Sequence, residues 1–198
     1  KAELFDQVDI LPENIYYPDG RMPKDAILEF CVQYEEKIQQ VGGIDCMLLG
    51  IGSNSNIMFN SAGTLQSSRT RMVLLEGASR KEAAATFAST DNVPAGIITM
   101  GISTMLKARS VILMAWGDEK ATIMKETIEG KISDGTPSTY LQIHQNAKAI
   151  VDLSAAYSLT RISHPWLVTS CEWDNKLIRR AIVWLCQKTG KPILKLTN

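Results

Sequence analysis

Apolar residues along the chain follow two different periodicities, which mark out helices and strands in turn. Residues 25–41 carry apolar side chains at steps of three and four, the spacing of one helix face, and Gly42 follows as a stop signal. Residues 44–50 form a short apolar run that ends in glycine, which is typical of a buried parallel strand. The apolar positions of the helix are Ile27, Phe30, Cys31, Tyr34, Ile38 and Val41.

The alternation continues and predicts three further helices and three further strands. The helices cover 79–87, after a Ser79 cap, 102–108 and 119–129, and the strands cover 96–101, 110–116 and 147–151. Strands that alternate with helices indicate the α/β class, with a mostly parallel, Rossmann-like sheet between helices on both faces, a three-layer α/β/α fold. Ligands of such sheets bind beyond the carboxyl ends of the strands.

The last helix has clear boundary signals. Asp174 is a suitable N-cap, and Trp173 and Ile178 are spaced as a hydrophobic staple around it. Gly190 is expected to end the helix, and residues 192–196 are expected to be extended.

The composition restricts the classes of function. Lys plus Arg and Asp plus Glu both number 21, so the formal net charge at pH 7 is zero. Binding to nucleic acid, or to a membrane surface through a polybasic anchor, needs a basic excess, so neither partner is expected. No apolar stretch is long enough to cross a bilayer and no apolar export segment is present, so a cytoplasmic location is expected. The cysteines and histidines are widely spaced, so no metal site is expected.

The loop after the first strand is the strongest candidate for ligand binding. Gly50 and Gly52 allow the backbone to approach a ligand closely, and free N–H groups there can hold an anion. The third glycine of a dinucleotide fingerprint is missing and no GxxxxGK[ST] segment occurs, so neither an NAD site nor a Walker loop is expected. On spacing alone, a tight turn without a ligand explains the two glycines equally well.

Two basic segments are further candidates for binding a phosphate. Lys120 lies at the start of a predicted helix, where the helix N-terminus and the ammonium both attract phosphate, although a solvated lysine is the plain alternative. Arg69 and Arg71 flank Thr70, and arginine suits bidentate phosphate binding, although a surface pair is the commoner outcome.

Several segments, in the same order, resemble the glucosamine-6-phosphate deaminase (isomerase) family. They read LLGIGSNSNIMFNSAG, SSRTR, NVPAGIITMGISTML, VILMAWGDEKATIMKETIEG and STYLQIHQNAKAIVD. The resemblance implies the family's α/β domain over residues 1–162, without the N-terminal part that carries a first phosphate loop and the base for the C2 proton. Residues 163–198 resemble the extension of longer bacterial members, and we expect a helical extension packed on the same domain.

The family converts glucosamine 6-phosphate and water to fructose 6-phosphate and ammonia, and it needs no cofactor. The resemblance therefore implies a sugar phosphate as the small-molecule partner, no cofactor, and a homo-oligomer, as is common among members. The chemistry calls for a carboxylate base at C2, a histidine–carboxylate arrangement for ring opening, and cationic and backbone groups for the phosphate.

The loop departs from the family pattern GxGxxGHIxFNEP at the residues that handle protons. The family's histidine falls on Asn56, its glutamate on Ser61 and its common aspartate on Asn54. Amide and hydroxyl side chains do not exchange protons near pH 7, so the ring-opening relay is expected to be impaired.

Other positions of the family site are retained. Lys120 keeps the position of a phosphate ligand, and Gly50 and Gly52 keep the backbone part of the loop. Arg71 keeps a position that some members use for an allosteric amino-sugar phosphate, although the accompanying basic residue falls on Val73.

Four interpretations follow from these residues. The protein is an impaired deaminase, a sugar-phosphate binder or regulatory homologue without turnover, a hydrolase of the 6-phosphogluconolactonase kind, or a structural domain without a ligand. Asn56 disfavours the third, because that class also needs a histidine in the loop. The retained Lys120 favours the first two over the last.

Overall fold

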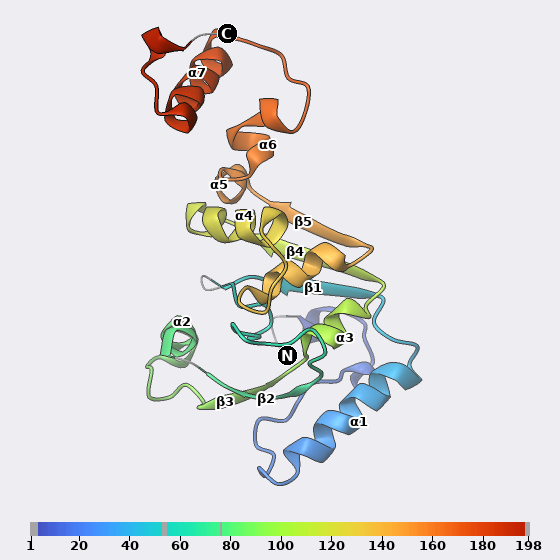
Figure 1. The fold of residues 1–198 in the computed structure, drawn as a ribbon. Coiled ribbons are helices and arrows are strands. Elements are labelled where there is room, and N and C mark those ends of the chain that lie inside the picture. The colour runs from blue at the N-terminus through green and yellow to red at the C-terminus, as the bar shows by residue number, and fades with distance from the viewer. Residues whose placement is uncertain (1–3, 53–54, 76, 197–198) are drawn as a thin grey trace.

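Three strands form a parallel sheet at the centre of the protein (Figure 1). A computed structural model describes residues 4–52, 55–75 and 77–196 of the chain. The strands are β1 (Cys46–Gly50), β4 (Ser110–Ala115) and β5 (Ala147–Val151), in the spatial order β1-β4-β5, and both pairings are parallel. The predicted α/β class with a mostly parallel sheet is confirmed.

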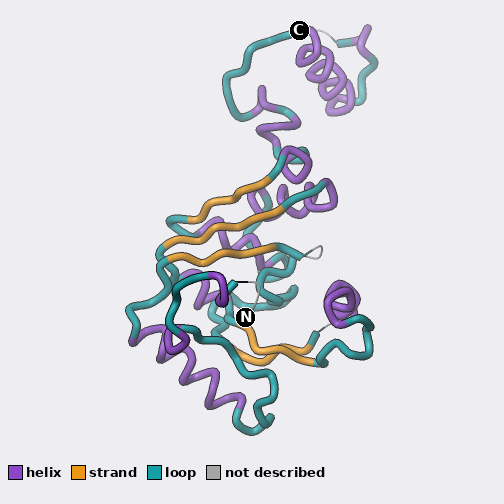
Figure 2. Tube along the Cα trace, turned by 180° about the vertical axis from the view of Figure 1, so that it is seen from behind, coloured by secondary structure: helices purple, strands orange, loops and turns teal. Residues whose placement is uncertain are grey.

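Alternate side chains of the central strands β1 and β4 are buried in the hydrophobic core. Met47 and Leu49 of β1 belong to a buried cluster with residues of α3 (Ile102–Leu106) and α4 (Ala121–Glu129). Leu48, which points to the opposite face of the sheet, is 63% exposed. Seen from behind, the strands stand in front of the helices that cover this core (Figure 2), so in the described part of the chain one face of the sheet is the better covered.

Helix α1 (Ile27–Gln40) forms within the predicted range and packs its inner face against the neighbouring strand β2 (Arg71–Leu74). Its buried residues are Cys31 and Glu35. The helix ends at Gly42 and Gly43, whose φ angles of 91° and 92° lie in the region that glycine adopts without steric cost. The predicted stop signal is thereby confirmed.

A second, two-stranded sheet was only half predicted. β2 (Arg71–Leu74) pairs antiparallel with β3 (Gly96–Thr99), and α2 (Gly77–Phe87) connects the two strands. The sequence indicated a strand at 96–101 but none at 71–74, where four alternating residues are too few to stand out. Helix α2 begins before Ser79, so the prediction that Ser79 caps it is wrong.

The remaining helical segments are short. The 3-10 turns are η1 (Phe5–Gln7), η2 (Pro12–Asn14), η3 (Asp118–Lys120), η4 (Pro137–Ile143), η5 (Pro165–Leu167) and η6 (Ile193–Lys195), and the single-turn α-helices are α5 (Leu153–Ala156) and α6 (Thr160–Ser163). The predicted helix 119–129 is thus a 3-10 turn followed by α4. The extended piece expected at 192–196 is wrong, because η6 forms there.

Helix α7 (Asn175–Thr189) has the predicted boundaries. The Asp174 carboxylate accepts a hydrogen bond from the Leu177 N–H at 2.6 Å, and Gly190 ends the helix with a φ of 66°. Figure 1 shows α7 beyond α5 and α6, away from the central sheet, and none of its residues is buried. No helix in the described ranges combines the length and apolar character needed to cross a bilayer.

Candidate functional site

The glycine loop after β1 folds back on itself. The Gly52 N–H donates to the Asn56 carbonyl oxygen at 3.0 Å, and Ile51 and Ile57 form an isolated antiparallel bridge. Asn54, a predicted site residue, lies outside the described residues. The turn brings Asn56 back to the level of the end of β1.

The segment after the turn is held in an unusual backbone conformation by a buried asparagine. Met58 and Phe59 have φ angles of 49° and 57°, which side-chain-bearing residues adopt rarely and at a cost. Asn60 is fully buried, and its Nδ2 donates to the Met100 carbonyl at 2.9 Å and to the Ile57 carbonyl at 3.0 Å. Asn60 thereby fixes the loop to the end of β3. We did not single out this residue in the sequence, although it stands in the quoted family segment.

A cavity of about 580 Å³ opens between this loop and α2, and we call it the β1–α2 cavity. Its described lining consists of Leu48, Leu49, Gly50, Ile51, Gly52, Asn56, Met58, Phe59, Ser79, Ala83 and Phe87. None of these side chains titrates near neutral pH. The cavity lies at the carboxyl end of β1, where ligands of parallel sheets bind.

Asn56 makes the polar contact across this cavity. Its Nδ2 donates to the Ser79 hydroxyl of α2 at 3.1 Å. Both partners are neutral, so the pair can fix the loop relative to α2 and offer hydrogen bonds to a ligand, but it cannot take up or release a proton near pH 7. Ser79 therefore has a role inside the helix that its expected capping role did not suggest.

Lys120 lies at the same edge of the sheet but outside the lining of this cavity. The register pairs Gly50 with Met114, so the segment after β4 that carries Lys120 emerges beside the glycine loop. Lys120 is half-buried, and among the described residues its ammonium has no hydrogen-bond or ion-pair partner. The structure thus brings Gly50, Gly52 and Asn56 together on one cavity and leaves Lys120 on the neighbouring strand end.

Neither Ser61 nor Arg71 lines the β1–α2 cavity. Ser61 is half-buried, and its carbonyl accepts from the Thr64 N–H at 3.1 Å. The Arg71 guanidinium donates to the Thr64 hydroxyl at 3.4 Å and to the Arg69 carbonyl at 3.3 Å. Burial lowers the pKa of Arg71 from its ordinary value, but the side chain stays a cation. The allosteric role expected of Arg71 stays a prediction.

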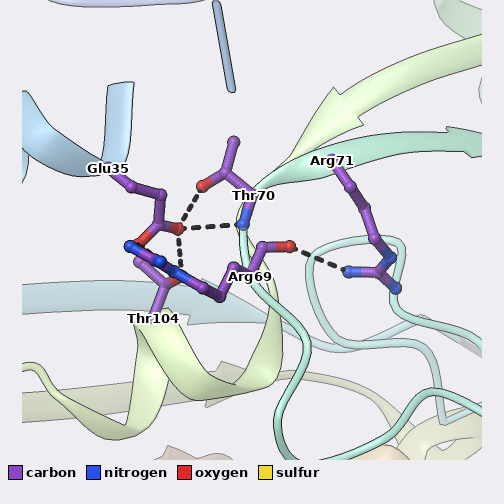
Figure 3. A network of polar contacts seen from close by, with 5 residues as sticks. All are labelled: Glu35, Arg69, Thr70, Arg71 and Thr104. Atoms are coloured by element: carbon purple, nitrogen blue, oxygen red, sulfur yellow. Dashed lines mark hydrogen bonds and ion pairs between the residues drawn. The ribbon is translucent and has the colours of Figure 1, made fainter. Parts of the chain in front are cut away.

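The most elaborate polar cluster was missed by the sequence reasoning. The carboxylate of Glu35 in α1 accepts hydrogen bonds from the Thr70 N–H at 2.9 Å, the Thr70 hydroxyl at 2.6 Å and the Thr104 hydroxyl (Figure 3). The Arg69 guanidinium lies 3.3 Å from its second oxygen. We call this cluster the Glu35 junction, since it joins α1, the start of β2 and α3. Arg69, predicted as a phosphate ligand or a surface residue, is exposed and is one of its members.

The carboxylate of the Glu35 junction is ionised despite its burial. Burial by itself raises the pKa of Glu35, but hydrogen bonds from Thr104 and Thr70 and the charge of Arg69 outweigh this, so the pKa lies below its ordinary value. A sequence signal existed, because Glu35 follows Cys31 by one helical turn on the apolar face of α1. A charged residue at such a position points to a buried partner.

Comparisons with known proteins link the chain to one family of sugar-phosphate enzymes. The sequence model described as glucosamine-6-phosphate isomerases/6-phosphogluconolactonase matches residues 1–151. A glucosamine-6-phosphate deaminase-like protein of Bacteroides thetaiotaomicron is 57% identical over 198 residues, which make up 100% of this chain and 30% of that protein. A glucosamine-6-phosphate deaminase of Oceanobacillus iheyensis is 41% identical over 157 residues, 79% of this chain and 62% of that protein.

Solved structures give the same result. A monomeric glucosamine-6-phosphate deaminase superposes with a TM-score of 0.74 at 35% identity, over 78% of this chain and 63% of that one. A 6-phosphogluconolactonase from Trypanosoma cruzi superposes with a TM-score of 0.54 at 21% identity, which supports the fold alone. The chain therefore spans less than two thirds of the length of these relatives.

Proposed function

The chain belongs to the glucosamine-6-phosphate isomerase/6-phosphogluconolactonase family, and from this premise we propose that its β1–α2 cavity binds a phosphorylated amino sugar. The reaction class is that of the deaminases, glucosamine 6-phosphate and water to fructose 6-phosphate and ammonia, and its rate in this protein is strongly reduced. The cavity's position at the carboxyl end of β1 supports the ligand class.

The neutral Asn56–Ser79 pair is the observation that carries the reduced rate. Ring opening and the C1–C2 proton shift both need a group that gains and loses a proton in the transition state. Asn56 stands where the family resemblance places a histidine, and its amide is bonded at 3.1 Å to a hydroxyl. Loss of a general acid–base group typically lowers a rate by about 10²–10⁴-fold.

Lys120 is proposed as the group that neutralises the phosphate. Its ammonium is uncommitted among the described residues, and its segment emerges beside Gly50 at the edge of the sheet. If a ligand lies on the glycine loop with its phosphate toward β4, the phosphate faces the neighbouring loop that carries Lys120. The glycines of the loop, which let the backbone approach a ligand closely, supply the second part of the site.

Binding without any turnover is the second candidate function. The retained lysine beside a cavity without titratable side chains favours it, since a sensor or regulatory subunit needs affinity and no chemistry.

We further propose that the protein is cytoplasmic and forms a homo-oligomer. Light scattering of the purified protein tests the oligomer, and a monomer across the accessible concentration range would contradict it.

Thermal unfolding in the presence of glucosamine 6-phosphate tests the proposed ligand. We expect about 2.7 kcal/mol of stabilisation at 100 times the dissociation constant. Lys120→Ala should remove this stabilisation, whereas Lys131→Ala, which removes an exposed lysine after α4, should keep it. An equal shift in the Lys120 variant would exclude Lys120 from the site, and no shift in the unsubstituted protein would contradict the ligand itself.

A further inference from the structure

A second cavity lies between α4 and the C-terminal part of the chain, and we call it the α4–α7 cavity. Its volume is about 600 Å³, within the range of sites that hold small molecules. It is formed by α4, the segment from Tyr157 to Trp166, and α7, and it shares no lining residue with the β1–α2 cavity. Any ligand it binds is therefore independent of the function proposed above.

Contacts to α6 hold α7 in place beside this cavity. The Arg180 guanidinium donates to the Ile162 carbonyl at 3.1 Å and also to the Ser163 carbonyl. His164, Trp166 and Trp184 lie with ring centroids 5.4 to 6.1 Å apart, as aromatic packing requires. The aromatic contacts hold the C-terminal segment together, and the bond from Arg180 to Ile162 joins α7 to the chain before residue 163.

The wall of the α4–α7 cavity carries three cations. Lys125 of α4 and Arg179 and Arg180 of α7 all line it, and in the described ranges none of them has a carboxylate within ion-pair distance. Glu129, one turn further along α4, does not line the cavity and is bonded to Thr160 at 2.6 and 2.7 Å. Such a cluster in a chain of zero net charge favours a small anion, and arginine pairs suit phosphate in particular.

The electrostatic environment of His164, which lines the α4–α7 cavity, is consistent with the binding of an anion there. Burial lowers the pKa of His164 from its ordinary value, and the charges of Lys125 and Arg180 lower it further. The neutral imidazole thus adds no charge of its own at pH 7, and the cations remain available to an anion.

Aromatic side chains form the apolar part of the wall. Tyr157, Trp166 and Trp184 line the cavity, and tryptophan faces stack well on planar rings and on the apolar faces of sugars. The Trp166 Nε1 atom is buried and has no hydrogen-bond acceptor in the described part of the chain. An unpaired buried donor is unfavourable, and an acceptor on a bound ligand would offset this.

We propose that the α4–α7 cavity binds a phosphate ester of a ring compound, with the phosphate on Lys125, Arg179 and Arg180 and the ring against Trp166 and Trp184. A sugar phosphate and a nucleoside monophosphate share this chemistry. Inorganic phosphate lacks the ring and is bound more weakly.

Tryptophan fluorescence of the full chain gives a local test. In a Trp116→Phe background the remaining tryptophans are Trp166, Trp173 and Trp184, all in the C-terminal part, so a signal from the β1–α2 cavity is suppressed. Glucosamine 6-phosphate, AMP and inorganic phosphate are titrated separately. We expect saturable quenching by at least one of the two esters, and the ester that quenches identifies the source of the ring.

Charge variants assign the signal to the cavity. Lys125→Gln combined with Arg179→Gln should lower the affinity for the ester that quenches by at least about tenfold, the factor expected for the loss of one charge-assisted hydrogen bond. Lys188→Gln, which removes an exposed cation of α7 outside the lining, should leave the affinity unchanged. Arg179→Gln alone, at an exposed position, serves as the second variant if the double variant does not fold.

Three results would overturn the proposal. They are the absence of saturable quenching by either ester at millimolar concentration, equal affinity in the Arg179 variant, and binding of inorganic phosphate as tight as that of the esters. The first two exclude the anion site, and the third excludes the ring subsite. None of them depends on whether the β1–α2 cavity binds a sugar phosphate.

Discussion

The Glu35 junction and the β1–α2 cavity lie in neighbouring parts of one domain, and their polar groups are arranged in opposite ways. In the junction an ionised carboxylate is buried and accepts hydrogen bonds from two threonines, with an arginine beside it. In the cavity the polar pair is Asn56 and Ser79, and the described lining contains no titratable side chain. Charged groups therefore tie structural elements together in the junction, whereas the described lining of the cavity proposed to bind the ligand is neutral.

This difference separates two uses of a polar residue. A buried carboxylate whose lone pairs are all engaged is a structural tie, since its proton affinity is too low for acid–base work near neutral pH. A cavity lined by amide, hydroxyl and apolar groups offers binding but no proton transfer. The predictions below test each side of the comparison, from the largest expected effect to the smallest.

Removing the carboxylate of the junction should have the largest effect. Glu35→Ala leaves the buried donors of Thr70 and Thr104 without an acceptor, while the exposed Arg69 stays solvated, and we expect the free energy of unfolding to fall by about 1–3 kcal/mol. Urea unfolding measures it. Glu36→Ala, at the exposed next position of α1, should change it by less than about 0.5 kcal/mol. Equal effects of both variants would show that the junction is not a structural tie.

Filling the β1–α2 cavity should remove ligand binding without comparable loss of stability. Ala83→Trp places an indole in the lining, and we expect the affinity for glucosamine 6-phosphate to fall at least about tenfold. Ala84→Trp makes the same change on the same helix outside the lining, so it matches the cost in helix propensity. Calorimetric titration compares the two, and undiminished binding in the Ala83 variant would place the ligand elsewhere.

Acid should weaken the junction. Because the pKa of folded Glu35 lies below its ordinary value, the carboxylate contributes stability that is fully present above the unfolded pKa of about 4.3 and is lost as the pH falls through the folded pKa. The difference in unfolding free energy between the unsubstituted protein and Glu35→Gln should therefore shrink below about pH 4. A difference that stays constant down to strongly acidic pH contradicts the assigned role.

The cavity, in contrast, should bind its ligand with little dependence on pH. Fructose 6-phosphate carries no amine, and a phosphate monoester has its second pKa near 6, so between pH 7 and 9 we expect its affinity to change by less than about twofold. Calorimetric titrations at both pH values measure this. A steep change in that interval would reveal a titrating side chain at the site and contradict the neutral lining.

Much of the fold could be predicted because it follows from local patterns. The buried strands before Gly50 and Trp116, the α1 face and the Asp174 cap each depend on a few neighbouring residues. β2 could not be predicted, since its four residues gain stability from pairing with β3, more than twenty residues further along the chain. The Ser79 cap was wrong because α2 begins at Gly77, which places Ser79 inside the helix, where its hydroxyl accepts from Asn56.

The roles of the candidate site residues stay predictions. The glycine loop and Asn56 line one cavity, whereas Lys120 and Ser61 lie outside its wall. Glu35 was overlooked because its partners Thr70 and Thr104 belong to distant segments, and such contacts are set by tertiary packing. Asn60 was overlooked because an amide that satisfies backbone carbonyls leaves no chemical signature in a sequence.

Ammonia release from saturating glucosamine 6-phosphate tests the central claim most directly. The assay runs the whole protein beside the Oceanobacillus iheyensis deaminase, and binding is verified by calorimetry in the same preparation. The account predicts saturable binding with a rate at least about 10²-fold below that of the deaminase, or no release at all. Saturable binding with release at the rate of the deaminase would contradict it, since proton transfer would then proceed in a site whose described lining has no group to perform it.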